Sequence, residues 1–315
     1  MIDVLTFGET MAALRAGQPL QLGGCLNLSV AGAESNVAIG LSRLGHTARW
    51  AGLTGDDEFG RLVLRTLRAE GVDVSRAATT DAGPTGLVVF EPRIADLVRV
   101  TYYRTGSAGS TLSTDHVRAA LSDGARIVHV TGVTAALGPG PREAVGEAVR
   151  CAPTRGARVS LDVNYRARLW SPEEAASALR PLAGHTDVVI ASDDELPLVA
   201  DARATTEYAR VESLLEQGVA EVVVKRGADG AEVFDSSGST SRPAVSVPVR
   251  DTVGAGDAFV AGYLSGLLDG ETVPTRLERA VAAGAFAVAS PGDWEGLPAR
   301  AELGLLAVTP GSTIR

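Results

Sequence analysis

Short apolar runs alternate with longer segments of helical periodicity along most of this chain, and this alternation restricts its fold more than any other feature. A strand-like run followed by a helical segment is typical of a strand–helix–strand unit, which pairs its strands in parallel. The sequence predicts core strands at residues 4–7, 48–53, 127–131, 159–162, 188–191, 222–225 and 231–234. We therefore expect an α/β protein built on a mainly parallel sheet.

Three of the intervening helices are expected to end at recognisable residues. Segments 35–44 and 58–70 end at or directly before Gly45 and Gly71, and segment 142–150 lies shortly before Pro153. Glycine commonly ends a helix and proline cannot continue one. These boundaries support the predicted order of strands and helices.

Two stretches depart from the alternation. Residues 86–91 and 97–104 are rich in strand-forming side chains and predict an antiparallel hairpin, and residues 11–15 and 21–30 supply further candidate strands. We expect one domain over residues 1–315, with a small β-sheet lid built from about 11–30 and 86–104.

Composition excludes several classes of function. The 315 residues carry a formal net charge of −9 without a basic stripe, so nucleic acid is not an expected partner. The longest apolar run, residues 280–289, is too short to span a membrane, and the N-terminus does not resemble a secretory signal, so we expect a cytoplasmic protein. Cys25 and Cys151 are expected to be reduced and buried.

Lys225 is the single lysine among 29 basic residues. Nucleotide bias toward arginine codons explains the general pattern, and the surviving lysine then has two explanations. It occupies a site that needs a compact ammonium group, for example beside phosphate, or it survives by chance.

The segment 251–259, DTVGAGDAF, carries the strongest chemical signal. An apolar helix follows, so Gly254, Ala255 and Gly256 form a loop at its N-terminus and direct free backbone N–H groups outward, as an anion hole requires. Asp257 would repel a phosphate held there, but it suits a base that removes a proton from an attacking hydroxyl group. The alternative is an aspartate that only caps the helix.

Other phosphate and metal motifs are absent from the sequence. It contains no G-x-x-x-x-G-K-[ST] and no complete G-x-G-x-x-G, which argues against a P-loop and an ordinary Rossmann site. The four histidines lack zinc-ligand spacing.

Two signatures together resemble the ribokinase-like (PfkB) carbohydrate kinases. Residues 251–264 resemble the second signature of that family, residues 31–45 resemble the first, and 52–60 match between them. The resemblance covers essentially the whole chain. It implies a doubly wound α/β fold with helices on both faces of the sheet and a β lid. It also implies transfer of phosphate from ATP to a sugar hydroxyl, with Asp257 as the catalytic base and Gly254, Ala255 and Gly256 in the anion hole.

Residues 100–110 and 161–166 further resemble the 2-keto-3-deoxygluconate kinases of this family, which phosphorylate a sugar acid at its terminal hydroxyl. Tyr102 and Arg104 share one face of a strand, where they offer a phenol to a sugar hydroxyl and a guanidinium to a carboxylate. An arginine on an edge strand can also simply face solvent. The resemblance implies a substrate site formed by Gly32, Asn36, Tyr102, Arg104, Arg166 and Asp293.

The resemblance also implies positions for the nucleotide and cations. ATP would contact Asn164, Ser192, Lys225, Gly227, Gly230, Gly254 and Gly256. Ser192 departs from the asparagine of many relatives, whereas Glu195 matches the residue linked to Mg²⁺, and Asp251 corresponds to a K⁺-site residue in some members. We expect ATP and Mg²⁺ as cofactors, K⁺ as an optional one, and a homo-oligomer. The alternatives are another kinase of the family, such as a fructokinase, and a catalytically silent sugar or nucleotide sensor.

Overall fold

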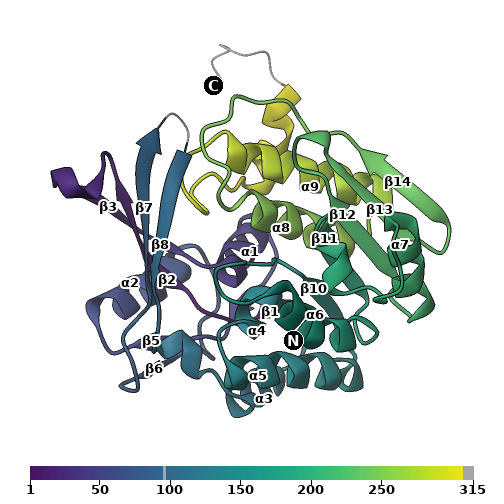
Figure 1. The fold of residues 1–315 in the computed structure, drawn as a ribbon, viewed down its shortest axis with the longest axis horizontal. Coiled ribbons are helices and arrows are strands. Elements are labelled where there is room, and N and C mark those ends of the chain that lie inside the picture. Colours follow the sequence, from purple (N-terminus) through teal and green to yellow (C-terminus); the bar gives the residue numbers. More distant parts are fainter. Residues whose placement is uncertain (95–96, 308–315) are drawn as a thin grey trace.

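The chain forms an eight-stranded main sheet and a separate four-stranded sheet that stands away from it (Figure 1). The computed structural model describes residues 1–94 and 97–307, so the last eight residues of the expected domain lie outside it. The main sheet has the order β14-β13-β12-β11-β10-β9-β1-β4. Its strands are β1 (Ile2–Thr6), β4 (Ala48–Trp50), β9 (Ala125–Thr131), β10 (Arg158–Asp162), β11 (Val188–Ser192), β12 (Glu221–Lys225), β13 (Ala231–Asp235) and β14 (Gly238–Arg242).

The predicted parallel sheet is confirmed. Strands β4, β1, β9, β10, β11 and β12 pair in parallel, and only β13 and β14 add antiparallel pairs at one edge. The carboxyl ends of all parallel strands therefore lie on the same side of the sheet, and open α/β sheets bind their ligands beside these carboxyl ends.

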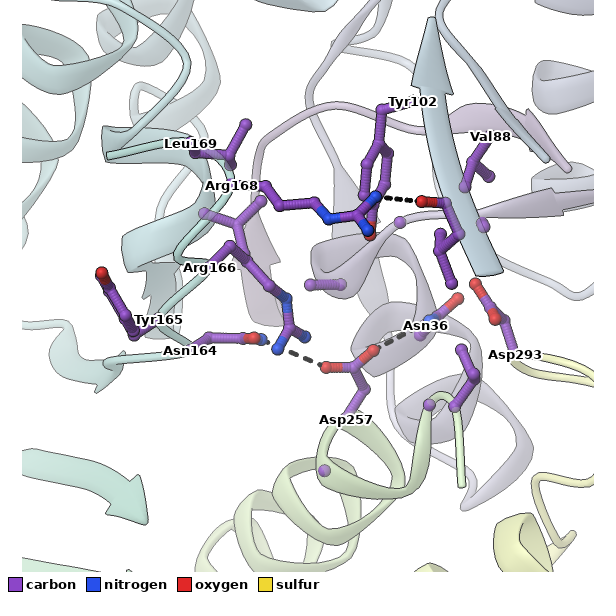
Figure 2. Close-up of a pocket in the computed structure, with 18 of the residues that line it drawn as sticks. Asn36, Val88, Tyr102, Asn164, Tyr165, Arg166, Arg168, Leu169, Asp257 and Asp293 are labelled. Carbon is purple, nitrogen blue, oxygen red and sulfur yellow. Dashed lines mark hydrogen bonds between the residues drawn. The ribbon is translucent and has the colours of Figure 1, made fainter. Parts of the chain in front are cut away.

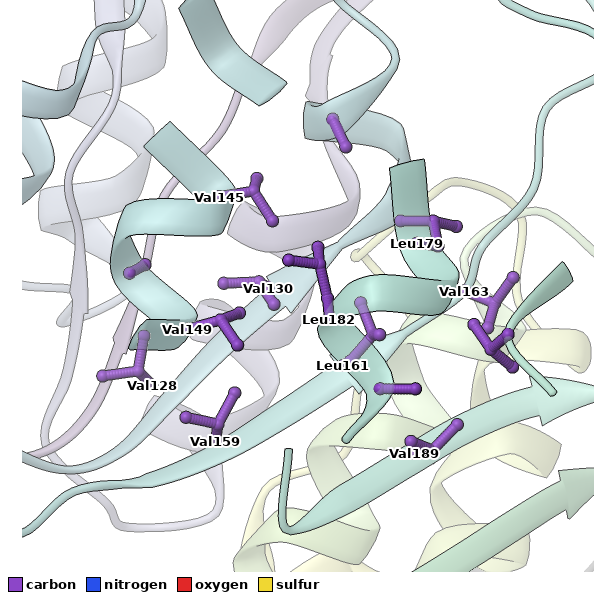
Figure 3. Packing of buried hydrophobic residues seen from close by; sticks show 14 of the residues in the cluster. Val128, Val130, Val145, Val149, Val159, Leu161, Val163, Leu179, Leu182 and Val189 are labelled. Atoms are coloured by element: carbon purple, nitrogen blue, oxygen red, sulfur yellow. The ribbon is translucent and has the colours of Figure 1, made fainter. Parts of the chain in front are cut away.

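Helices cover both faces of the main sheet because neighbouring residues of each strand point to opposite sides. Val128 and Val189 pack with the helices of one face, whereas Ile127 and Val188 belong to the core of the other. Figure 3 shows the first core, in which Val145 and Leu179 meet these strands. The first face carries α3 (Thr114–Leu121), α5 (Pro139–Cys151), α6 (Pro172–Ala183) and α7 (Glu207–Glu216), and the second carries α1 (Ala33–Arg43), α2 (Glu58–Ala69), α8 (Ala255–Leu268) and α9 (Val273–Val288). This is the predicted doubly wound fold.

One predicted strand is divided in two. Residues 48–53 were expected to form a single strand, but β4 ends at Trp50, and β5 (Leu53–Gly55) pairs instead with β6 (Ala78–Thr80). Gly52 lies between β4 and β5 and packs closely against the backbone of Gly8. A Cβ at position 52 would lie only 2.4 Å from the Gly8 carbonyl oxygen, so a side chain does not fit there. The chain leaves the main sheet at this crowded point.

The second sheet contains the four segments predicted for it, in the order β3-β2-β7-β8. They are β2 (Met11–Ala16), β3 (Leu26–Ala31), β7 (Leu87–Ile94) and β8 (Leu97–Tyr103), with β7 and β8 antiparallel as expected. Met11, Val88 and Phe90 form the apolar inner face of this sheet. The expectation of two buried cysteines was wrong, because Cys25, just before β3, is exposed and Cys151 is only partly buried.

No helix within residues 1–94 and 97–307 combines the length and the apolar character that crossing a membrane would require.

Candidate active site

The predicted site residues meet between the carboxyl ends of the parallel strands and the inner face of the second sheet. A cavity of about 680 Å³ opens there. Figure 2 shows side chains from α1, from β8 of the second sheet, from the loop after β10 and from the start of α8 converging on it. The predicted residues that line it are Gly32, Asn36, Tyr102, Arg104, Asn164, Arg166, Ser192, Glu195, Lys225, Gly254, Gly256, Asp257 and Asp293.

The loop before α8 adopts the geometry that the sequence predicted. Gly254 precedes the helix with φ 75°, and a Cβ there would lie 1.9 Å from the Asp293 carbonyl oxygen, so only glycine fits. The helix begins at Ala255, and its first backbone N–H groups have no partner within the helix. Asp257 lies in this first turn and is 7% exposed.

Asp257 is held by two asparagines in a buried position. Asn36 Nδ2 donates to its Oδ2 at 2.8 Å, and Asn164 Nδ2 lies 3.4 Å from its Oδ1 (Figure 2). Burial raises the pKa of Asp257 to about 6, although the Asn36 hydrogen bond and the Arg166 charge act in the opposite direction. A carboxylate with such a pKa is ionised at neutral pH and close to the value that favours proton transfer.

Asn164 owes its position to its backbone, which has φ 38°. It is the one non-glycine residue with positive φ in the described part of the chain. Asparagine tolerates this conformation better than most residues, and such strain is often found at functional sites.

Lys225, the lone lysine, lies at the end of β12 and forms an ion pair across the sheet. Its Nζ contacts the two carboxylate oxygens of Asp162, at the end of β10, at 2.8 and 3.1 Å. Burial opposes the charged form, but Asp162 and Glu195 together raise the pKa of Lys225 above its ordinary value, so it remains cationic. The lysine therefore has a structural partner that the sequence did not indicate.

Glu195 is oriented by backbone amides and faces the same cavity. Its Oε1 accepts from the Tyr165 N–H at 2.6 Å and its Oε2 from the Ser192 N–H at 2.8 Å. The Ser192 hydroxyl turns toward Asp194 at 2.5 Å. Mg²⁺ typically binds one or two carboxylates together with substrate phosphates, and the fixed, buried carboxylate of Glu195 fits this pattern.

Arg104 faces the cavity but is already paired, which corrects the expectation of a guanidinium free for a substrate carboxylate. It forms an ion pair with Glu9, whose side chain is buried, at 2.5 Å. Ser107 donates to the same carboxylate. Tyr102 lies on the same side of the strand as Arg104, as predicted, with the guanidinium carbon 5.5 Å from its ring centre.

Arg166 and Arg168, in contrast, point into the cavity without an acidic partner among the described residues (Figure 2). Arg168 donates to the carbonyl oxygen of Val100 in β8 and so connects the loop after β10 with the second sheet. Both arginines are exposed to solvent, and Arg166 lies close enough to Asp257 for its charge to favour the ionised form of that carboxyl group.

A second cavity, of about 580 Å³, shares Lys225, Thr252 and Gly256 with the first. Apolar side chains predominate in its lining, including Val245, Phe259, Val281 and Val288. Of the residues predicted to contact ATP, Lys225, Gly227, Gly230 and Gly256 lie here, whereas Asn164, Ser192 and Gly254 line only the first cavity.

Asp251 and Asp293 are joined by an arginine of the second sheet. Arg15 Nη1 lies 2.8 Å from Asp251 Oδ2, and its Nη2 lies 2.9 Å from Asp293 Oδ1. Burial raises the pKa of Asp293 to about 7, while the Arg15 charge favours its ionised form. The expectation that Asp251 holds K⁺ does not fit this arrangement, because an arginine already occupies its carboxylate.

Sequence reasoning missed Glu9, Arg15 and Arg168 as parts of this site. Arg168 lies two residues after Arg166, and this spacing in a polar loop was a usable signal. Glu9 and Arg15 carried none, because their partners are 95 to 278 residues away along the chain.

Comparison with known proteins agrees with this geometry. Residues 1–300 match the family model described as pfkB family carbohydrate kinase. A 2-dehydro-3-deoxygluconokinase of Bacillus subtilis is 36% identical over 96% of this chain and 94% of its own length, and one of Thermoproteus tenax is 37% identical over 96% and 93%. A 2-dehydro-3-deoxygalactonokinase of Haloferax volcanii is 32% identical over 90% of each chain.

Solved structures give the same result. The 2-dehydro-3-deoxygluconokinase of Thermotoga maritima superposes with a TM-score of 0.85 at 27% identity, covering 98% of both chains. A putative ribokinase II of E. coli in complex with ATP and Mg²⁺ superposes with a TM-score of 0.90 at 26% identity, covering 98% of this chain and 99% of its own. The fold, the signatures and the arrangement around Asp257 therefore lead to one assignment: the chain belongs to the pfkB family of carbohydrate kinases, enzymes that transfer a phosphoryl group to a sugar hydroxyl.

Proposed function

We propose that this protein transfers the γ-phosphoryl group of ATP to the terminal hydroxyl of 2-keto-3-deoxygluconate, giving the 6-phosphate and ADP. The observation that carries the proposal is the pair Arg166 and Arg168, which face the sugar cavity without an acidic partner among the described residues. Both side chains are exposed to solvent in this structure. Once the lid covers a bound sugar, a neutral substrate would leave these cations desolvated and unpaired, which costs free energy, whereas a carboxylate would pair with them. The relatives named above as 2-dehydro-3-deoxygluconokinases support the same substrate.

In this proposal Asp257 is the catalytic base. Its ionised carboxylate accepts the proton of the substrate hydroxyl while that oxygen forms a bond to the γ-phosphorus. The bond between the γ-phosphorus and the bridging oxygen breaks, and ADP leaves with the electron pair. The amides of Ala255, Gly256 and Asp257 and the helix dipole stabilise the charge on the transferring group.

The second cavity accommodates the nucleotide in this proposal. Its apolar walls suit an adenine base, and the two cavities meet at Gly256 and Lys225, where the γ-phosphate must lie for transfer. A Cβ on Gly256 would lie 3.8 Å from Lys225 Nζ, so the ammonium group adjoins the anion hole. Glu195 would help to hold Mg²⁺, and the ion would neutralise charge on the phosphates when bound.

The four-stranded sheet serves as the lid of a single-domain enzyme. Its inner residues Val88, Val100 and Tyr102 form one wall of the sugar cavity, so closure of this sheet would exclude water from the reaction. Val88 lies opposite Tyr102, where a second hydroxyl group could have contacted the sugar. With only one phenol on this wall, we expect the galactonate epimer to react as well.

The substrate class is tested by an ADP-release assay with 2-keto-3-deoxygluconate, fructose and ribose. The sugar acid should have the highest kcat/KM, and Arg166→Ala should lower this value by about one to two orders of magnitude, because a charge-assisted hydrogen bond contributes about 1.5–3 kcal/mol. Arg226→Ala is the matched control, since its guanidinium is already paired with Glu207 and Glu232 outside the sugar cavity. The proposed sugar-acid substrate is refuted if fructose has the same kcat/KM as the acid, or if Arg166→Ala lowers kcat/KM equally for the acid and for a neutral sugar. In either case only the assignment as a carbohydrate kinase would remain.

The outer face of the lid is proposed to bind a second copy of the chain. Leu26 and Leu28 of β3 and Tyr103 of β8 are exposed on the face opposite the cavity, and most of the exposed large hydrophobic residues lie in or beside this sheet. Leu26 and Leu28 lie on one edge strand of the sheet and Tyr103 on the other. The leucine pair is the proposed contact, because exposed apolar surface marks association sites. Light scattering should find an oligomer, and Leu28→Asp should convert it to a monomer; a wild-type monomer would refute the interface.

A further inference from the structure

Arg15 makes contacts that connect the lid with the loops around the anion hole. The residue lies in lid strand β2, and its guanidinium stacks on Phe90 of β7, with 4.0 Å between the guanidinium carbon and the ring centre. Its two terminal nitrogens contact Asp251 and Asp293, which belong to two different loops outside the lid, at 2.8 and 2.9 Å. The side chain of Arg15, which is 21% exposed, therefore connects the lid with the loop that carries Asp251 and the loop that carries Asp293.

The two loops held by Arg15 flank the anion hole directly. Asp251 lies three residues before Gly254, and Gly254 packs against the carbonyl oxygen of Asp293 so closely that no side chain fits between them. The Gly292 N–H also donates to Asp251 Oδ2 at 3.2 Å. A change in the spacing of these loops would therefore move the backbone amides at the start of α8.

Three of the four acceptor positions of the Asp251 carboxylate are already in use, and the charge of the carboxylate is already compensated by Arg15. Oδ1 accepts from the Val253 N–H at 3.1 Å, and Oδ2 accepts from both Arg15 and the Gly292 N–H. A potassium ion needs a shell of free oxygen atoms, and the guanidinium charge would repel it. The residues present therefore do not fit the K⁺ site that some members of the family have.

We propose that Arg15 is a positioning residue that supplies, from the lid, the positive charge which holds the anion-hole loops together, so that this protein works without a monovalent cation. Without Arg15, nothing would offset the burial and the neighbouring charges of Asp257, Glu295 and Asp251 that raise the pKa of Asp293. Asp293 would then take up a proton at neutral pH, and the charged contacts that tie both loops to the lid would be lost. The loops would then separate unless another cation entered. Because Arg15 belongs to β2, the loops receive this charge when the lid lies over the cavity. The kinetic part of the inference rests on the proposed kinase function.

The test compares Arg15→Gln with wild type in KCl and in tetramethylammonium chloride at equal ionic strength. Wild-type kcat should be the same in both salts. Arg15→Gln should lose about tenfold to a hundredfold in kcat in tetramethylammonium chloride, since charge-assisted hydrogen bonds are lost. KCl, or guanidinium chloride at low and non-denaturing concentration, should restore part of this loss. Arg15→Lys, which keeps the charge, should lose less and remain insensitive to K⁺.

Arg49→Gln is the matched control. Arg49 also bridges two aspartates, Asp73 and Asp123, both at 2.7 Å, but lies outside the two cavities. This variant should lose thermal stability without any response of kcat to K⁺ or guanidinium. If Arg15→Gln behaves like Arg49→Gln, Arg15 is only a structural residue and the inference is wrong.

A second readout separates this inference from the proposed function. The melting temperature should be equal in the two salts for wild type and higher in KCl for Arg15→Gln, whatever the substrate is. A wild-type melting temperature or kcat that rises clearly in KCl would overturn the inference, even if Arg15→Gln does not fold. If no sugar is phosphorylated, the proposed function fails, and the salt dependence of the melting temperature still tests Arg15.

Discussion

Replacing Asn36 by leucine is expected to shift the pH dependence of turnover toward higher pH. Asn36 donates to Asp257 at 2.8 Å in a site where the carboxylate is almost completely buried. This hydrogen bond stabilises the ionised form of Asp257, so its loss should raise a pKa that burial already places at about 6. Leucine has nearly the shape of asparagine but no donor.

The size of the shift follows from the strength of the bond. A hydrogen bond to a charged group contributes about 1.5–3 kcal/mol, and one pKa unit corresponds to about 1.36 kcal/mol, so the pKa of Asp257 should rise by about one to two units. A base accepts a proton only in its ionised form. The kcat/KM should therefore rise with pH up to a plateau, and in Asn36→Leu the rising part should lie about one to two pH units higher.

The assay is kcat/KM for the sugar acid, measured by ADP release at saturating MgATP between about pH 5 and about pH 9. Asn164→Gly is the comparison variant, because the Asn164 amide lies 3.4 Å from Asp257 and glycine tolerates the positive φ. It should shift the profile less than Asn36→Leu. ATP ionises in the same way with every variant. The difference between the pH profiles of two variants therefore measures the difference in the pKa of Asp257.

One result would refute this reasoning. Asn36 also faces the sugar, so Asn36→Leu is expected to lower kcat/KM at every pH as well as to move the profile. If activity falls evenly and the midpoint stays at the wild-type pH, Asn36 acts only on the substrate. The ionisation observed in the profile would then belong to a group other than Asp257.

Three further predictions test other parts of the structure. Asp257→Asn should lower kcat by about 10²–10⁴ while titration calorimetry still detects MgATP binding; unchanged turnover would contradict its role as base. Lys225→Met should raise the KM for ATP more than that for sugar and lower the melting temperature, because Asp162 is left unpaired; adding Asp162→Asn should restore the melting temperature but not the KM. Burial lowers the pKa of His129 to about 3, so the free energy of unfolding should decline as pH falls below about 6.5, and less steeply in His129→Gln; parallel curves would exclude His129 as the cause.

Local sequence patterns were sufficient to predict the main elements. The core strands of the parallel sheet are buried on both faces, so their apolar runs are continuous, and the glycines after helices mark chain reversals within a few residues. The loop at Gly254 could be predicted for the same reason. Its turn, the helix after it and Asp257 in the first turn are all determined by neighbouring residues.

The sequence by itself thus determined the α/β architecture, the anion-hole loop and the aspartate beside it. Only the tertiary structure decided which charges are paired: Arg104 with Glu9, Lys225 with Asp162, and Arg15 with Asp251 and Asp293. These partners lie 63 to 278 residues apart, and they meet because of the order of strands in the sheet and the placement of the lid. An arginine in a sequence shows its charge but not its partner, since burial and pairing depend on packing between distant segments. Because Arg104 is paired with Glu9, we propose that Arg166 and Arg168 bind the substrate carboxylate instead.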